Sequence, residues 1–151
     1  MVETAERIRL GQLEIRFLLE GGASAGTLAV FEVDVPANAR VPIAHSHDAY
    51  EETIYGLRGT LAWTVEGRVH NVGPGEVLCI PRGAVHRFDN NTSGDAKVLC
   101  MVTPAAIGPL FFREVAEVLK AAGGGPPDGA RMMEIMLRYG LTPALPPQVP
   151  A

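Results

Sequence analysis

Residues 45–59 read HSHDAYEETIYGLRG, with two histidines two positions apart, a pair of adjacent glutamates and a closing glycine. Because alternate residues of a β-strand project from the same face, His45 and His47 can point together at one centre. A glutamate five residues after His47 enters an apolar run and can bring a carboxylate to the same place. On this stretch alone, the alternative that both histidines are ordinary solvated residues stays open.

Short apolar runs surround this stretch from about residue 12 to residue 103, and turn residues separate them. Several runs alternate apolar and polar residues with a period of two, which is typical of half-buried strands. Glu66-Gly67 marks a tight hairpin turn, and the sequence VGPGE at residues 72–76 marks another turn. Short, closely spaced strands of this kind predict an all-β antiparallel sandwich or small barrel.

A third histidine, His86, directly follows the turn sequence IPRGAV at residues 80–85 and begins another predicted strand. A strand that begins after a tight turn can aim one ligand at a centre defined by other strands. Three neutral imidazoles and one carboxylate suit a divalent transition metal, and Mn, Fe, Co, Ni, Cu and Zn all accept this set. Four protein ligands in an octahedral field would leave two positions open, unlike a closed structural zinc site.

These stretches resemble the two sequence motifs of the cupin superfamily. The first motif runs from His-x-His through Glu to Gly, and its spacing selects Glu52, because only Glu52 lies seven residues before Gly59. The second motif is matched at every fixed position, namely Gly75, Pro81, Gly83, His86 and Asn90. One departure is Ala39, which stands where the leading glycine of the first motif would fall. Its neighbour Asn38 is a residue type that tolerates a positive φ.

The resemblance covers about residues 27–103 and implies an antiparallel double-stranded β-helix, the jelly-roll cupin barrel. It also implies that a divalent transition metal is held inside by His45, His47, Glu52 and His86. The reaction does not follow, because cupins include dioxygenases, isomerases, epimerases, decarboxylases, sugar-binding proteins and storage proteins.

The leading hypothesis is a small dioxygenase-like metalloenzyme that acts on an organic small molecule in the barrel. A non-redox, metal-dependent isomerase or decarboxylase is one alternative, and a non-catalytic ligand-binding or sensor module is another. Glu52 could also act as a base, and no catalytic residue beyond the metal ligands is identified.

Four residues near the motifs are candidates for the substrate pocket. Ile54 shares strand parity with Glu52, and Phe88 shares it with His86, so both are expected on the inner wall, close to Trp63. Gly56 stands where many cupins carry a branched aliphatic residue, which motivates the hypothesis that it leaves extra room for a ligand. The alternative interpretation, that these residues are only barrel core, stays open.

After Pro104 the pattern becomes helical. One predicted helix precedes the glycines that start at Gly123, and its apolar stripe comprises Leu110, Phe111, Val115, Val118, Leu119 and Ala122. A second predicted helix begins after the capping residue Asp128 and ends at Gly140. The remaining tail, residues 141–151, is rich in proline and is expected to be extended or disordered. These features divide the chain into a barrel (1–103), a helical appendage packed on it (104–140) and the tail.

Composition and charge indicate which classes of partner and which cellular compartment to expect. The net charge of −4 and the absence of a Lys/Arg run disfavour nucleic acid. No apolar run approaches the ~20 residues of a membrane span, and the N-terminus lacks a signal-peptide pattern, so a cytoplasmic protein is expected. Cys79 and Cys100 lie in apolar runs and are expected to be reduced and buried. The cupin resemblance adds the expectation of a homodimer that binds a small molecule.

Overall fold

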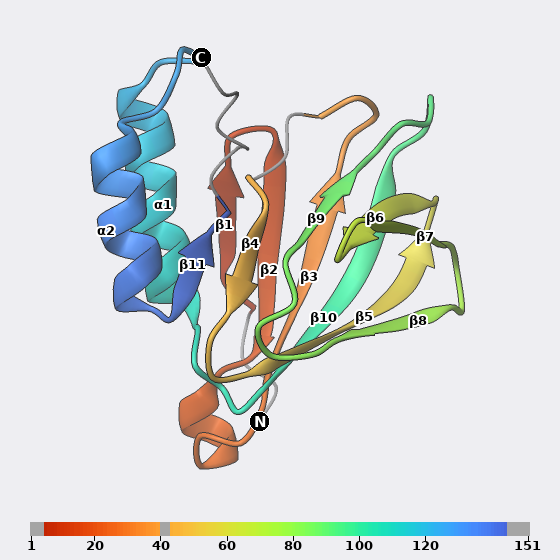
Figure 1. Ribbon diagram of the computed structural model, residues 1–151, viewed down its shortest axis with the longest axis horizontal. Helices are drawn as coiled ribbons and strands as arrows, with labels where there is room; N and C mark the ends of the chain where they lie inside the picture. The colour runs from red at the N-terminus through yellow and green to blue at the C-terminus, as the bar shows by residue number, and fades with distance from the viewer. Residues whose placement is uncertain (1–4, 40–42, 145–151) are drawn as a thin grey trace.

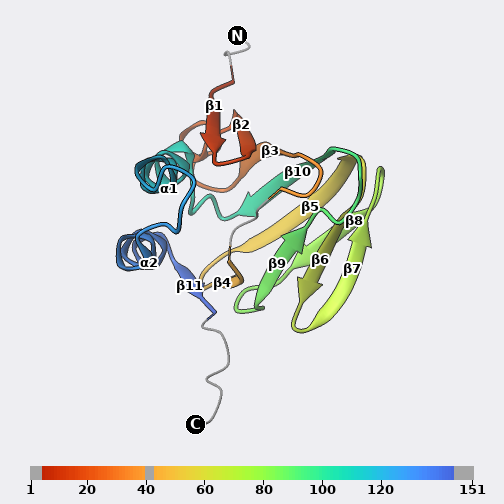
Figure 2. The same ribbon diagram turned by 90° about the horizontal axis from the view of Figure 1, so that it is seen from above.

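Two antiparallel β-sheets form the body of the protein, and two helices lie along one side (Figures 1 and 2). The computed structural model describes residues 5–39 and 43–144. The six-stranded sheet has the order β1-β2-β3-β10-β5-β8, and the five-stranded sheet has the order β11-β4-β9-β6-β7. The all-β jelly-roll fold predicted from the sequence is therefore confirmed. Within the described residues no hydrogen-bonded strand pair joins the two sheets, so the fold is the double-sheet form of a jelly roll.

The strands follow the apolar runs of the sequence, with three short additions (β1, β4 and β11). The strands of the first sheet are β1 (Arg7–Leu10), β2 (Leu13–Leu19), β3 (Ala29–Val35), β10 (Ala96–Thr103), β5 (Glu51–Arg58) and β8 (Val77–Ile80). Those of the second are β11 (Leu141–Pro143), β4 (His45–His47), β9 (His86–Asp89), β6 (Leu61–Val65) and β7 (Arg68–Val72). A 3₁₀ turn, Gly21–Ser24, links β2 to β3.

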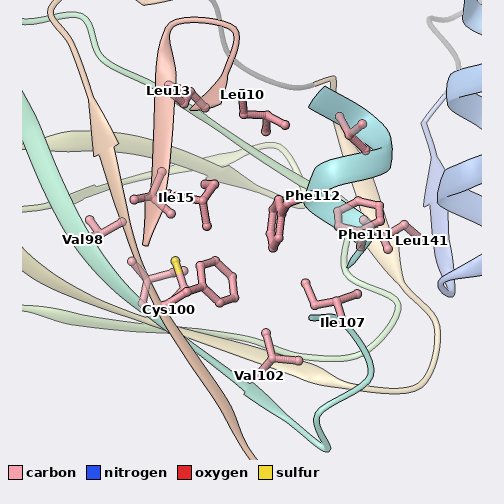
Figure 3. Close-up of a cluster of buried hydrophobic side chains, with 14 of the residues drawn as sticks. Leu10, Leu13, Ile15, Val98, Cys100, Val102, Ile107, Phe111, Phe112 and Leu141 are labelled. Atoms are coloured by element: carbon pink, nitrogen blue, oxygen red, sulfur yellow. The ribbon is translucent and has the colours of Figure 1, made fainter. Parts of the chain in front are cut away.

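The core lies between the sheets, because the strands alternate in burial. Every second residue of β3 and of β10 is buried, as a period of two requires for a half-buried sheet. The rings of Phe17 of β2 and Phe31 of β3 pack against each other at a tilt, with centroids 5.1 Å apart. Figure 3 shows the strand residues Ile15, Cys100 and Val102 gathered in one buried cluster with residues of the helical segment.

Two backbone predictions are confirmed. Glu66 and Gly67 both have positive φ, +47° and +77°, as a two-residue hairpin between β6 and β7 requires. Asn38 has φ +56°, and the Ala39 N–H donates to the Pro36 carbonyl at 3.1 Å. Asn38 thus supplies the left-handed turn beside the position where the cupin motif places glycine.

The helices are α1 (Pro109–Ala121) and α2 (Gly129–Arg138), close to the predicted positions. The Asp128 side chain accepts a hydrogen bond from the Arg131 N–H, so the predicted cap is confirmed. The predicted stripe of α1 was wrong at Leu110, which is 57 % exposed, whereas Phe112 is buried. At 100° per residue, Leu110 lies roughly 130° from the centre of the buried stripe.

One further feature differs from the expectations, and one adds to them. Cys100 is buried as predicted, but Cys79 is exposed, because it lies on the outer face of the edge strand β8 beside the exposed Val77. The first residues of the proline-rich tail form β11, which pairs with β4, while residues 145–151 lie outside the described part. Along the described chain, no helix is long and apolar enough to span a membrane.

Candidate metal centre

Three short elements bring the four predicted ligands together between the two sheets. β4 carries His45 and His47, and β9 begins at His86, which is the register partner of His45. Glu52 comes from the other sheet, on β5, where its neighbours are Val102 of β10 and Ile80 of β8. The geometry of the centre therefore depends on how the two sheets pack against each other.

Four side-chain atoms converge at distances that fit a single ion. The Nε2 atoms of His45 and His47 are 3.2 Å apart. One Glu52 carboxylate oxygen, Oε2, lies 3.6 Å from His47 Nε2 and 3.5 Å from His86 Nε2. The three histidines offer nitrogen atoms that all lie within 4.8 Å of one another. Ligands about 2.1 Å from an octahedral metal are separated by roughly 3 Å when adjacent, so a modest contraction would bring these four atoms within bonding distance of one ion.

Backbone carbonyls set the tautomers of two of the histidines. His45 Nδ1 lies 2.9 Å from the Ile43 carbonyl oxygen, and His86 Nδ1 lies 2.9 Å from the Ala84 carbonyl oxygen. A carbonyl can only accept, so each Nδ1 donates and each Nε2 keeps a free lone pair directed at the centre. His86 Nε2 is buried and, among the described residues, has no hydrogen-bond partner. Such an orphaned acceptor fits a metal ligand.

The direction of the pKa shift suits a metal at three of the four residues. Burial lowers the pKa of His47 to about 4 and lowers the pKa of His45, so both imidazoles are neutral near pH 7. Burial by itself would raise the pKa of Glu52, but the His86 imidazole, whose Nε2 lies 3.5 Å from Oε2, and the other two histidines lower it overall. Burial by itself would lower the pKa of His86. The Glu52 carboxylate has the opposite effect, and the pKa of His86 is raised overall. Neutral His45 and His47 imidazoles beside a Glu52 carboxyl of lowered pKa are the forms that bind a metal, whereas a metal at His86 must compete with a proton.

Two residues that the sequence analysis did not place at this centre lie beside it. The Tyr50 ring stacks on the His47 ring with centroids 4.4 Å apart, and its buried hydroxyl has no partner among the described residues. Burial and the nearby Glu52 carboxylate raise the pKa of the Cys100 thiol. Strand parity could have indicated Cys100, since it lies on the inward face of β10, two residues from Val102.

Three of the four candidate pocket residues lie in the interior beside the centre. Ile54 and Trp63 are buried, and Phe88 is partly buried against the core. Trp63 of β6 is the register partner of Phe88 of β9, with ring centroids 4.9 Å apart. The Trp63 Nε1–H is buried and has no acceptor within the described residues.

The hypothesis that Gly56 leaves room for a ligand was wrong. A Cβ on Gly56 would lie 1.9 Å from the Gly73 carbonyl oxygen and 2.6 Å from its carbon. The Gly56 N–H donates to the Glu76 carbonyl, and the Gly75 N–H donates to the Gly56 carbonyl, each at 2.9 Å. The turn at residues 73–76 fills the space beside Gly56 and packs against the β5 backbone.

Glu51 and His70 lie outside the centre. Glu51 accepts two hydrogen bonds from the Arg82 guanidinium, at 2.7 and 3.2 Å, on the outer surface. His70 is exposed on β7. The choice of Glu52 over Glu51, made from motif spacing, agrees with these positions.

Comparison with known proteins gives the family. Residues 31–102 match the model of the cupin domain family. This segment is a cupin domain. The chain is 25% identical over 114 residues to quercetin 2,3-dioxygenase of Bacillus subtilis, a match that covers 74% of this chain and 32% of that protein. The chain thus spans about a third of the length of the curated relative.

Solved structures agree with this fold. A predicted oxalate decarboxylase of Thermotoga maritima is 21% identical, with a TM-score of 0.61 over 69% of this cupin and 98% of that chain. A sugar phosphate isomerase of the cupin superfamily from Silicibacter pomeroyi is 24% identical, with a TM-score of 0.54 over 62% of this chain and 60% of that one. A polyketide cyclase of Streptomyces resistomycificus is 27% identical, with a TM-score of 0.55 over 66% and 67%.

Proposed function

We propose that this cupin binds one divalent transition metal through His45, His47, Glu52 and His86 and is a dioxygenase-like enzyme for a small organic molecule. The observation that carries the proposal is the convergence of three Nε2 atoms and one carboxylate oxygen from both sheets. Two of the imidazoles are held by backbone carbonyls in the tautomer that a ligand needs. The identity of the metal stays open among Fe, Mn, Ni, Cu, Co and Zn, because all of them accept this set.

The residues around the centre have separable roles in such a reaction. A bound metal would supply Lewis-acid or redox chemistry at the ligand positions that the protein leaves free. The three histidines lower the pKa of Glu52, which favours the carboxylate form that could take a proton from a substrate. Trp63, Phe88 and Ile54, which are buried or partly buried, would offer apolar surface to a substrate. The unpaired Tyr50 hydroxyl and Trp63 Nε1–H are donors for substrate oxygen atoms.

The similarity to quercetin 2,3-dioxygenase supports an oxygen-dependent reaction. The polyketide cyclase, 27% identical, favours a second candidate, a non-redox reaction such as an isomerisation or decarboxylation. Ring closure by itself requires no oxidant, so a cupin scaffold of this type does not need oxygen chemistry. A homodimer, a cytoplasmic location and the division at residues 103 and 140 stay predictions.

Turnover with and without oxygen separates these candidates. Protein loaded with each candidate metal is incubated with a panel of diols, diketones and flavonoid-like compounds, and oxygen uptake and product are followed. We expect oxygen consumption in step with product, its loss in Glu52→Gln, and its retention in Glu51→Gln, the adjacent surface carboxylate. Turnover that persists anaerobically would establish the non-redox candidate instead. Ligand capture without product under any condition would contradict an enzymatic function.

A further inference from the structure

The strand that carries His45 and His47 depends on the C-terminus of the described chain. On one side, β4 meets β9 through the single register pair His45–His86, with one more hydrogen bond from the Gly83 N–H to the His47 carbonyl at 2.8 Å. On its other side, β11 pairs with all three residues of β4. The strand holding half of the candidate ligands is thus supported mainly by a segment that comes about a hundred residues later.

The backbone ladder between these strands fixes how the two histidines are held. The Asp48 N–H donates to the Gly140 carbonyl at 2.9 Å, and the Ala144 N–H donates to the Ala44 carbonyl at 2.8 Å. Because hydrogen-bonded pairs alternate along an antiparallel ladder, Thr142 and Ser46 form the hydrogen-bonded pair between these two.

The intervening pairs are Leu141 with His47 and Pro143 with His45, where side chains approach most closely. Each histidine therefore has a residue of β11 as its direct cross-strand neighbour. Pro143 lacks an N–H, but its nitrogen faces the open edge of the sheet, so no hydrogen bond between β11 and β4 is lost. The missing donor also protects this edge from pairing with a further strand.

The helices anchor β11 to the core. The strand leaves α2 through Tyr139, whose ring packs on that of Phe111 of α1 with centroids 5.3 Å apart. Leu141 is 3 % exposed and belongs to the same buried cluster as Phe111 and Ile107 (Figure 3). Phe112 in turn packs on Phe17 and Phe31, at 5.7 and 5.2 Å. A continuous set of packed residues therefore joins the outer helices to the histidine strand.

We propose that residues 141–144 act as a C-terminal clasp that holds His45 and His47 in the geometry of the metal centre. Leu141 and Thr142 are then positioning residues, and metal affinity depends on the docking of α1 and α2. By thermodynamic reciprocity, metal binding must strengthen the docking of the clasp and of α2 by the same factor. This inference rests on the proposed metal site, which the same experiment tests separately.

The test is a calorimetric titration with Ni²⁺. Thr142→Pro removes the N–H that the ladder needs, and Thr142→Val keeps it while removing only the surface hydrogen bond from Thr142 to Asp48. Groups that orient metal ligands typically contribute ~10–100-fold to affinity, so we expect a loss of that size in Thr142→Pro and little change in Thr142→Val. Truncation after Gly140 should weaken binding similarly, whereas truncation after Ala144 should not.

A matched pair separates positioning from general loss of stability. Leu141→Ala should weaken Ni²⁺ binding, whereas Leu13→Ala, an equally buried leucine of β2 that adjoins no ligand strand, should leave it unchanged. In the unaltered protein, Ni²⁺ should slow amide hydrogen exchange in β11 and α2, which keeps the test valid if a variant does not fold.

The outcomes discriminate between the two proposals. Wild-type protein that binds no Ni²⁺ would overturn the metal site itself. Wild-type binding with unchanged affinity in Thr142→Pro and Leu141→Ala, or with unchanged exchange in β11, would overturn the clasp alone.

Discussion

Substitution of Gly56 by alanine tests whether the interior near β5 is packed backbone or ligand space. The added Cβ would lie 1.9 Å from the Gly73 carbonyl oxygen, and that carbonyl belongs to backbone that cannot rotate away like a side chain. The φ of Gly56 is not positive, so the effect is steric and not conformational. Relief requires the turn at residues 73–76 to move away from β5, which breaks the two hydrogen bonds between them.

The expected cost follows from these contacts. Overpacking typically costs ~1–3 kcal/mol and the two lost hydrogen bonds together cost ~2 kcal/mol, so Gly56→Ala should lower the free energy of unfolding by about 3–5 kcal/mol. For a domain of this size, that corresponds to a fall in Tm of about 6–20 °C. Gly22→Ala is the control, because its Cβ meets nothing within 4 Å. It should stay within ~0.5 kcal/mol of wild type in urea denaturation.

The opposite result would restore the idea that Gly56 borders a ligand cavity. If Gly56→Ala unfolds at the wild-type urea midpoint, the turn does not occupy that space and the packing derived above is incorrect.

Two other predictions concern stability. The folded-state pKa of His47, about 4, lies below its unfolded value near 6.5, so His47 contributes stability above pH 6.5 that is lost as the pH falls toward 4. At 1.36 kcal/mol per unit this loss is about 3 kcal/mol, offset in part by His86, whose raised pKa acts in the opposite direction. Metal-free protein should therefore show a lower urea midpoint at pH 4.5 than at pH 7, and an unchanged or higher midpoint would contradict the burial argument. Asn90 is buried, and its side-chain amide donates to three backbone carbonyls, so Asn90→Ala should cost ~2–4 kcal/mol in the same assay. Asn91→Ala, at the exposed neighbouring position, should be nearly neutral, and equal effects of the two would refute this role.

Local signals account for most of what the sequence predicts correctly. A strand period of two explains why His45 and His47 face one centre, and spacing to Gly59 distinguishes Glu52 from Glu51, which pairs with Arg82 outside. The positive φ of Asn38 also follows from the chemistry of its own side chain. Such features depend on a few neighbouring residues, so one sequence is enough to recognise them.

The errors arise where distant segments meet. Position 56 has room only for glycine because the turn at residues 73–76 packs against it. The sequence of β5 alone does not predict that contact. The three residues of β11 are too few to show a period, so their pairing with β4 could not be foreseen in a proline-rich tail. Cys79 lies in an apolar run, but whether such a run is covered depends on its place at the edge of the sheet.

The most direct test of the central claim is the metal content of the purified protein by elemental analysis. The proposed ligands predict close to one equivalent of a transition metal per chain in wild type and in His70→Ala, whose histidine is exposed on β7. His47→Ala and Glu52→Ala should both lose that metal while retaining the fold by circular dichroism. Metal content that is unchanged in both variants would contradict the assignment of the site.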